Sequence, residues 1–230
     1  MLIGVEKLCN AQQWQPGHAT FYNEAPGGAC GFGTGEAQGL YKQKLTTALN
    51  GPLFEKGATC GSCWLVKCVD NQWCLPNAPT IKVVATDLCP PGGNGVCNPQ
   101  YKHFDMSIPA FTKIAVYKGG YIAIQYARTK CDVQGGMRFT ISGNPTFFLV
   151  LVWNVGGDGQ VVGMSVKTPQ SQWQPMSRNW GQNWQLNVKN GLQGNSLSFQ
   201  VRTSDGKSVV SNNVAPGNWQ FGQTYTGINF

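Results

Sequence analysis

Short β-rich runs dominate this chain, and several of them alternate hydrophobic and polar positions with the two-residue period of a strand. The clearest runs are residues 80–86, 121–126, 137–141 and 196–203, each bounded by Gly, Pro or Asn. Many short strands separated by turn residues are typical of β-barrels and β-sandwiches. The pattern therefore predicts an all-β protein.

One segment has the periodicity of a helix instead. In residues 109–118, Phe111, Ile114 and Ala115 fall on one helical face, and the pair of glycines that follows would end a helix. We predict a helix here and little helix elsewhere.

Cysteine and tryptophan divide the chain into two parts. All nine cysteines lie in the first 131 residues, whereas five of the eight tryptophans lie beyond that point. Residues 132–136 (DVQGG) have the composition of a linker, and few contacts usually cross such a segment. We predict two domains, residues 18–133 and residues 134–230, each long enough to bury a core.

The cysteines also indicate a compartment. This cysteine density is usual in oxidising compartments and rare in the cytosol, so we predict a secreted, extracellular protein. Against this, the first ten residues carry Glu6 and Lys7 and lack an apolar stretch of signal-peptide length. No run approaches the roughly 18 apolar residues of a membrane span, so we expect none.

Charge argues against one class of partner. The net charge is +7 and the pI about 9.0, but only 12% of residues are charged, and the Lys and Arg residues are scattered singly. A nucleic-acid binder would cluster them, so we expect no nucleic acid. Diffuse basicity fits retention by an acidic polysaccharide matrix, or simply a basic surface without a specific partner.

The CGSC sequence at 60–63 raises the question of a zinc or redox site. The two histidines lie far from it in sequence, and the setting is predicted to be extracellular, so disulfides are favoured. We therefore predict no metal and no cofactor. Eight cysteines allow 105 pairings, and the spacing alone does not choose among them.

Eight short motifs occur in one order: ATFY (19–22), GGACG (27–31), CGSC (60–63), CPP (89–91), CNP (97–99), HFD (103–105), GGMRFT (135–140) and MSRNWGQNW (176–184). Together they resemble the expansins, most closely the plant α-expansins, over roughly residues 18–230. The resemblance implies a six-stranded double-psi β-barrel followed by an immunoglobulin-like β-sandwich that binds carbohydrate. It also implies the disulfides Cys30–Cys60, Cys63–Cys131, Cys68–Cys74 and Cys89–Cys97. Cys9 stands outside this set and is either a free thiol, which we favour, or a partner in an intermolecular disulfide.

Asp105 is the leading candidate for chemistry. Hydrolysis of a glycosidic bond usually requires two carboxyl groups, which lie roughly 6.5–9.5 Å apart in inverting enzymes. By resemblance, Asp105 matches an acid position that expansins share with the family 45 endoglucanases. The less favoured alternative, without the resemblance, is an Asp that caps the turn before Ser107 and Pro109.

A partner for Asp105 is harder to find. Asp87 departs from the usual Asn of α-expansins; it could flank the same groove and raise the proton affinity of Asp105 by like-charge repulsion, or be an ordinary strand-end residue beside a disulfide. The endoglucanases place their base near the position of Tyr22, where this chain has no Asp and only Glu24 nearby. Because no convincing base is present, we predict that the protein is not an enzyme.

Two further side chains are predicted to line the groove. Thr20 and Tyr22 alternate with Phe21 and therefore share one strand face. A tyrosine offers a flat ring and a hydroxyl, both suited to sugars. His103 could share the face of Asp105, or be a packed structural histidine.

Sugars present flat C–H faces, so a β-glucan binder needs exposed aromatic rings. By motif match, Phe147 and Trp180 take the platform positions of the second domain, with Phe148 as a possible addition. Trp153 lies on the strand face of Phe147, about 20 Å along the strand, and could extend the row. In residues 146–153 both strand faces are apolar, so periodicity does not identify the outer one.

The other tryptophans of this half, Trp173, Trp184 and Trp219, are predicted to pack in the core, where most large aromatic side chains lie.

These observations predict a secreted, monomeric, non-hydrolytic wall-loosening protein. It would bind cellulose or xyloglucan, disrupt contacts between polysaccharides and act best at acidic pH, where protonated Asp105 can donate a hydrogen bond. One alternative is an inverting β-glucan endoglucanase that uses Asp105 with Glu24 or Asp87. Another is a passive carbohydrate-binding protein whose barrel is inert. The preferred polysaccharide stays open.

Overall fold

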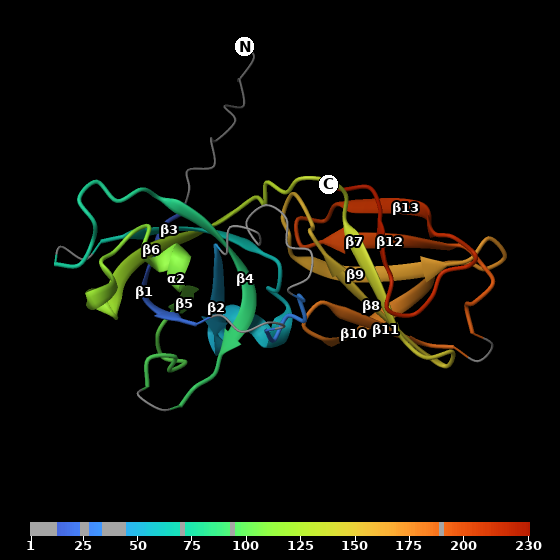
Figure 1. The fold of residues 1–230 in the computed structure, drawn as a ribbon, viewed down its shortest axis with the longest axis horizontal. Helices are drawn as coiled ribbons and strands as arrows, with labels where there is room; N and C mark the ends of the chain where they lie inside the picture. Colours follow the sequence, from blue (N-terminus) through green and yellow to red (C-terminus); the bar gives the residue numbers. More distant parts are fainter. Residues whose placement is uncertain (1–12, 24–27, 34–44, 70–71, 93–94, 189–190) are drawn as a thin grey trace, which may run out of the picture.

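The computed structural model describes residues 13–23, 28–33, 45–69, 72–92, 95–188 and 191–230. Within these ranges the chain forms two β-domains side by side along the long axis of the molecule (Figure 1). Cys9 and Glu24 lie outside the described residues, so the roles predicted for them stay predictions. The boundary between residues 133 and 134 also stays a prediction.

The first domain is a closed barrel of six strands in the order β1-β5-β2-β4-β3-β6. The strands are β1 (Gln15–Tyr22), β2 (Thr46–Asn50), β3 (Cys63–Cys68), β4 (Ile81–Cys89), β5 (His103–Ser107) and β6 (Ile122–Thr129). The pairs β1–β5 and β2–β4 are parallel and the others antiparallel. Fully buried side chains such as Leu49, Val83 and Phe104 fill the interior. Outward side chains of neighbouring strands therefore form rows across the surface.

In its described residues, the barrel domain contains little helix, in four short pieces. These are α1 (Gly51–Phe54), η1 (Glu55–Gly57), α2 (Ile108–Phe111) and η2 (Tyr117–Gly119), where η denotes a 3₁₀ turn.

The helix predicted over residues 109–118 is therefore wrong beyond Phe111. The backbone of residues 114–116 pairs with residues 73–75: Leu75 N–H donates to the Ile114 carbonyl, and Val116 N–H donates to the Trp73 carbonyl. Phe111, Ile114 and Ala115 are nevertheless buried. The apolar pattern predicted burial correctly. The backbone groups of residues 114–116, however, form hydrogen bonds with residues 73–75 and not within a helix.

The second domain is a β-sandwich of eight strands. These are β7 (Arg138–Gly143), β8 (Phe147–Trp153), β9 (Val161–Lys167), β10 (Gln174–Trp180), β11 (Asn183–Asn187), β12 (Leu197–Thr203), β13 (Ser208–Ala215) and β14 (Thr224–Thr226). Strand β10 belongs to both sheets, because its first part pairs with β9 and its last part with β11. The inner faces meet in a core where the rings of Phe139 and Phe199 stack at 4.7 Å. The predicted barrel followed by a sandwich is confirmed.

Four disulfides hold the first domain, and they join the pairs that the resemblance implied: Cys30–Cys60, Cys63–Cys131, Cys68–Cys74 and Cys89–Cys97. The sandwich strands β7–β14 contain no cysteine. Its stability therefore rests on packing and hydrogen bonds, whereas cross-links also restrict the unfolded barrel.

The turn between β10 and β11 fixes the sandwich to the barrel. The Gln182 amide N–H donates to the Cys30 carbonyl at 3.0 Å, and its side-chain Nε2 donates to the Cys60 carbonyl at 2.6 Å. Gly181 has a φ of +52°, and a Cβ there would lie 2.5 Å from the Cys30 oxygen, so only glycine fits. The Arg178 guanidinium donates to the carbonyls of Gly181 and Gly57 at 2.6 and 3.3 Å.

A second contact lies at the other side of the junction. Arg128 of β6 donates to the carbonyl and the carboxylate of Asp158, both at 3.2 Å. Together the two contacts define how the domains sit relative to one another.

Candidate functional site

One row of side chains crosses four adjacent barrel strands. Thr20 of β1 pairs with Asp105 of β5, Asp105 with Ala48 of β2, and Ala48 with Asp87 of β4. Since paired strands lie about 4.8 Å apart, the Cα atoms of Asp87 and Asp105 are about 9.6 Å apart. The fold thus brings three of the four predicted groove residues into one row.

The row faces outward. Phe104 and Met106 point into the core, so Asp105 between them points away from it. On β4, the register shifts between Thr47 and Ala48, so that Asp87 rather than Thr86 lies opposite Ala48. The sequence alternation does not reveal this irregularity.

A hollow of about 610 Å³ lies in front of Asp105. Thr20, Phe21, Asp105 and Tyr121 line it, together with the loop that the Cys89–Cys97 disulfide closes. We call it the Asp105 hollow. Its lining is partly polar and partly apolar, as a site for sugars requires.

Among the described residues, one oxygen of Asp105 accepts a hydrogen bond and the other has no hydrogen-bond donor. Thr20 Oγ1 donates to Oδ1 at 2.6 Å, and His103 Nε2 lies 2.8 Å from the same hydroxyl. Because the hydroxyl has only one proton, His103 Nε2 must be the donor to it. Oδ2 lies 3.7 Å from Sγ of Cys89, which as a disulfide sulfur has no proton to donate.

Burial shifts the proton equilibria of this pair in opposite directions. It raises the pKa of Asp105; the Thr20 hydrogen bond opposes that rise, and the Asp87 charge adds to it. Burial, helped by His18, lowers the pKa of His103 to about 4. In mildly acidic solution His103 is therefore uncharged, while Asp105 keeps its proton more readily than an exposed aspartate.

Asp87 is held by backbone. Its Oδ1 accepts hydrogen bonds from Ala29 N–H at 2.6 Å and from its neighbour Leu88 N–H at 2.8 Å. These bonds tie the end of β4 to residues 28–31, which touch the sandwich. Asp87 thus joins the row of Asp105 to the domain junction.

Tyr22 lies one row further along. It pairs with Ser107, is partly buried, and packs against Ala48 and the Cys89–Cys97 disulfide. Tyr22 therefore lies next to the row that contains Asp105, and it contacts the Cys89–Cys97 disulfide.

Sequence reasoning missed His18. It pairs with His103 across β1 and β5, and its ring stacks on Tyr121 with centroids 5.0 Å apart. The alternation that linked Thr20 with Tyr22 extends to His18, so the signal was present in the sequence.

The exposure of the side chains of β8 shows which face of this strand is on the outside. Val150 and Val152 are fully buried, whereas Phe147 and Trp153 are half-buried. The structure contradicts a platform role for Phe148, which is only 1% exposed and packs edge-on against Trp219 at 5.6 Å. A ring in the core cannot stack on a polymer.

Trp180 lies on the same outer face. It pairs with Asn183 and, through it, with Leu151 of β8, so their side chains point to the same side. Trp180 is 48% exposed. We call the outward side chains of Phe147, Leu149, Leu151, Trp153 and Trp180 the β8 face.

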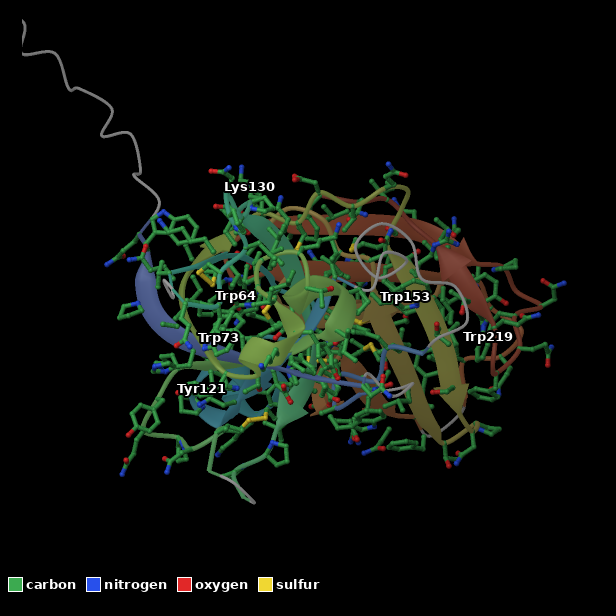
Figure 2. All side chains as sticks on the ribbon, turned by 60° about the vertical axis from the view of Figure 1, so that its left-hand side comes forward. Trp64, Trp73, Tyr121, Lys130, Trp153 and Trp219 are labelled. Carbon is green, nitrogen blue, oxygen red and sulfur yellow. A yellow bond between two sulfur atoms is a disulfide. The ribbon has the colours of Figure 1, made fainter. Side chains whose placement is uncertain are left out.

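The β8 face meets the barrel at Gly31. A Cβ on Gly31 would lie 2.9 Å from the indole of Trp180 and 2.6 Å from the Asn183 side chain. Residues 28–31 therefore touch Trp180 on one side and Asp87 on the other. Figure 2 shows Tyr121 on the barrel and Trp153 on the sandwich.

Two of the three tryptophans predicted to be core residues are buried, Trp184 at 4% and Trp219 at 2% exposure. Trp173 is only partly buried, with the Lys167 ammonium 4.8 Å from its ring.

Family models match both domains. One described as Expansin C-terminal domain matches residues 137–216, and one described as DPBB_1, Lytic transglycolase, matches residues 46–126. The chain is 47% identical to Expansin-A25 and 46% identical to Expansin-A23 of Arabidopsis thaliana, over 94% of its length and 80% and 81% of theirs. The chain belongs to the expansin family.

Solved structures share the fold. The crystal structure of an expansin from Clavibacter michiganensis matches with a TM-score of 0.70 at 20% identity, over 94% of this chain and 97% of that one. A mutant of an expansin from the same organism, in complex with cellohexaose, matches with a TM-score of 0.69 at 19% identity, over 93% and 96%. At this identity the likeness concerns the fold.

Two features are absent from the part of the chain that the structure describes. No helix there is long and apolar enough to cross a membrane. No cluster of three or more His, Cys, Asp or Glu side chains in those ranges has the arrangement of a metal site.

Proposed function

We propose that this expansin loosens plant cell walls by binding an extended β-glucan, such as cellulose or xyloglucan, and weakening its contacts with neighbouring polymers without hydrolysis. Family membership and the plant relatives support the wall-loosening role. The cellohexaose complex of the bacterial relative supports an extended sugar chain as ligand. The observation that carries the proposal is the single hydrogen-bonded, partly buried carboxyl in the Asp105 hollow.

The two domains would make different contributions. The β8 face offers rings and aliphatic side chains to the flat C–H faces of sugars. The Asp105 hollow offers hydrogen-bonding groups. Trp180, residues 28–31 and Asp87 form a continuous connection between them. One glucan chain can then touch both domains, and binding that favours a detached or twisted chain lowers the cost of separating it from its neighbours.

Protonation of Asp105 would set the pH dependence. With Oδ1 engaged by Thr20, a proton on Oδ2 is free for a sugar oxygen. The titratable groups near Asp105 in the described residues are Asp87, His103 and His18. The charge of Asp87 raises the pKa of Asp105, and His103 stays neutral down to about pH 4. Action should therefore be strongest in mildly acidic walls.

The same geometry supports the absence of hydrolysis. An attacking water needs a base on the far side of the sugar from the acid. Asp87 is the nearest carboxylate of the row, and one of its oxygens already accepts two backbone hydrogen bonds. That oxygen is therefore already engaged by the backbone and is not available to hold an attacking water.

A second candidate function is inverting endoglucanase activity. The Asp87–Asp105 separation of two strands, about 9.6 Å between Cα atoms, is compatible with the carboxyl spacing of inverting enzymes. The reducing-sugar assay described below therefore tests endoglucanase activity as well.

The setting of the protein belongs to the same proposal. Four disulfides support secretion into the wall, and scattered positive charge supports retention by acidic polysaccharide rather than by nucleic acid. We propose a monomer that needs no cofactor.

Creep of heat-inactivated wall strips under constant load tests the function. The intact chain should extend strips in mildly acidic buffer, and Asp105→Asn should reduce the rate at least about tenfold, since an amide N–H is a weaker hydrogen-bond donor than the O–H of a carboxylic acid. Asp205→Asn, which changes an aspartate on the sandwich paired with Lys207, is the matched control and should creep normally. Equal creep of wild type and Asp105→Asn would remove Asp105 from the mechanism.

A reducing-sugar assay on soluble β-glucan separates the alternatives. Non-hydrolytic action predicts no sustained release from any variant. Sustained release that Asp105→Asn and Asp87→Asn each abolish would establish the endoglucanase instead. Binding to cellulose without creep would favour the passive carbohydrate-binding protein.

A further inference from the structure

Tyr121 is an exposed aromatic residue on the barrel. It directly precedes β6, is 43% exposed, and lines the same hollow as Thr20 and Asp105. Neither its position nor its ring belongs to the motifs that carried the family resemblance.

The ring of Tyr121 is held flat by the two histidines. It stacks on His18 with centroids 5.0 Å apart and an interplanar angle of 23°, and on His103 at 5.9 Å and 21°. Because His18 and His103 are paired across β1 and β5, the ring lies across both strands. One face of the ring is thus covered by imidazoles, and the exposed remainder borders the hollow.

The spacing between the histidine pair under Tyr121 and the Thr20–Asp105 pair fits a neighbouring sugar. The His18–His103 pair lies two residues along the strands from the Thr20–Asp105 pair, which is about 6.6 Å. This is about the width of one sugar ring. A chain with one sugar against Asp105 can therefore place the next one over Tyr121.

We propose that Tyr121 is a sugar-stacking subsite of the barrel, which binds a pyranose ring of the same β-glucan chain beside Asp105. The proposal rests on the proposed function. The C–H face of the pyranose packs on the open face of the phenol ring, and the phenolic hydroxyl remains available to the sugar hydroxyls. The subsite extends the binding surface away from the sandwich, at the far end from Trp180.

Tyr101 provides the contrast. It is more exposed, at 52%, and also contacts His18, but edge-on, at 6.1 Å and 88°. It does not line the Asp105 hollow. Exposure alone therefore does not define the subsite; the flat ring at the hollow does.

Shape-matched variants of the full chain test the proposal by calorimetric titration with cellohexaose. Tyr121→Phe keeps the flat ring and should bind within about twofold of wild type, whereas Tyr121→Leu keeps apolar cover over the histidines and should bind about five- to tenfold more weakly. Tyr101→Leu is the control and should match wild type. Near-UV circular dichroism checks that each variant is folded.

Binding of cellohexaose at the β8 face could hide a loss of binding at Tyr121, so a second measurement observes the Tyr121 ring directly. In protein with ¹³C-labelled tyrosine rings, the Tyr121 signals should shift during the titration and those of Tyr101 should not. Unshifted Tyr121 signals, or equal affinity of Tyr121→Leu and wild type, would overturn the subsite. Failure of the proposed function is distinct, because wild type itself would then neither bind cellohexaose nor extend wall strips.

Discussion

The barrel and the sandwich expose two different kinds of surface. In the barrel, polar groups stand in a row fixed by the register of four strands, and four disulfides lie in that domain. In the sandwich, the strands contain no cysteine, and the exposed face of β8 is aromatic and aliphatic. In the proposed function, the first surface depends on the protonation of Asp105, and the second depends on contact area with the glucan. A single substitution in the row of Asp105 should therefore abolish the pH-dependent action, whereas a single substitution on the β8 face should only lower the affinity for glucan.

The segment 176–184 connects these two surfaces. Within nine residues it supplies an exposed ring in Trp180, a core ring in Trp184, and junction contacts through Arg178, Gly181 and Gln182. Burial lowers the pKa of Arg178 to about 10, which still leaves it charged at neutral and acidic pH. The motif thus serves placement of the domains as much as the binding proposed for Trp180.

The largest effect on stability and creep should come from a substitution that disrupts the junction between the two domains. Gly181→Ala would place a Cβ 2.5 Å from the Cys30 carbonyl oxygen at a φ of +52°. We expect a loss of roughly 2–4 kcal/mol in the free energy of unfolding, together with strongly reduced creep. Urea unfolding and the wall-strip assay measure the two.

Gly33→Ala is the matched control, because a Cβ at Gly33 would meet no heavy atom of the described residues within 4 Å. It should leave both quantities unchanged. If Gly181→Ala unfolds like wild type and creeps normally, the domains do not need this junction to act together.

An intermediate effect is expected on the β8 face. Trp180→Ala should weaken binding to cellulose about tenfold, since an exposed indole at the junction supplies much of the contact area. Phe147→Ala, at the far end of β8, should weaken it about threefold. Depletion isotherms on microcrystalline cellulose measure both.

Val162→Ala is the control for area, because Val162 is exposed on β9 in the other sheet. Its affinity should equal that of wild type. Equal losses in all three variants would mean that cellulose does not select the β8 face.

The smallest effect concerns stability and pH. The folded state raises the pKa of Asp105 above its ordinary value of 3.8, so ionised Asp105 opposes folding. Stability linked to this group is complete below pH 3.8 and is lost as pH rises through the folded pKa. Asp105→Asn, which cannot ionise, should therefore melt above wild type at pH 7, and the difference should shrink toward pH 4.

Thermal melts at several pH values test this prediction, and Asp205→Asn is again the comparison. The Thr203 and Lys207 contacts lower the pKa of Asp205, so its ionised form favours folding. That variant should lose stability at neutral pH if it changes at all. A melting temperature of Asp105→Asn below that of wild type at pH 7 would contradict the burial argument.

Much of the architecture could be predicted from residues alone. The strand runs around residues 80–86 and 196–203 became β4 and β12, and cysteine placement marked the two domains. The disulfide pairs came from the resemblance, because spacing does not distinguish 105 arrangements. The helix over residues 109–118 failed because pairing with residues 73–75 is a long-range contact that local periodicity does not contain.

By itself, the sequence determined which residues avoid water and which strand positions share a side, since alternation and apolar content are local properties. Only the tertiary structure decided that Phe148 is inside and Phe147 outside, because both faces of β8 are apolar and the second sheet covers one of them. It also decided that Asp87 holds residues 28–31 and that Tyr121 lies over two histidines. These are contacts between strands distant in the chain, and they exist only once the barrel has closed.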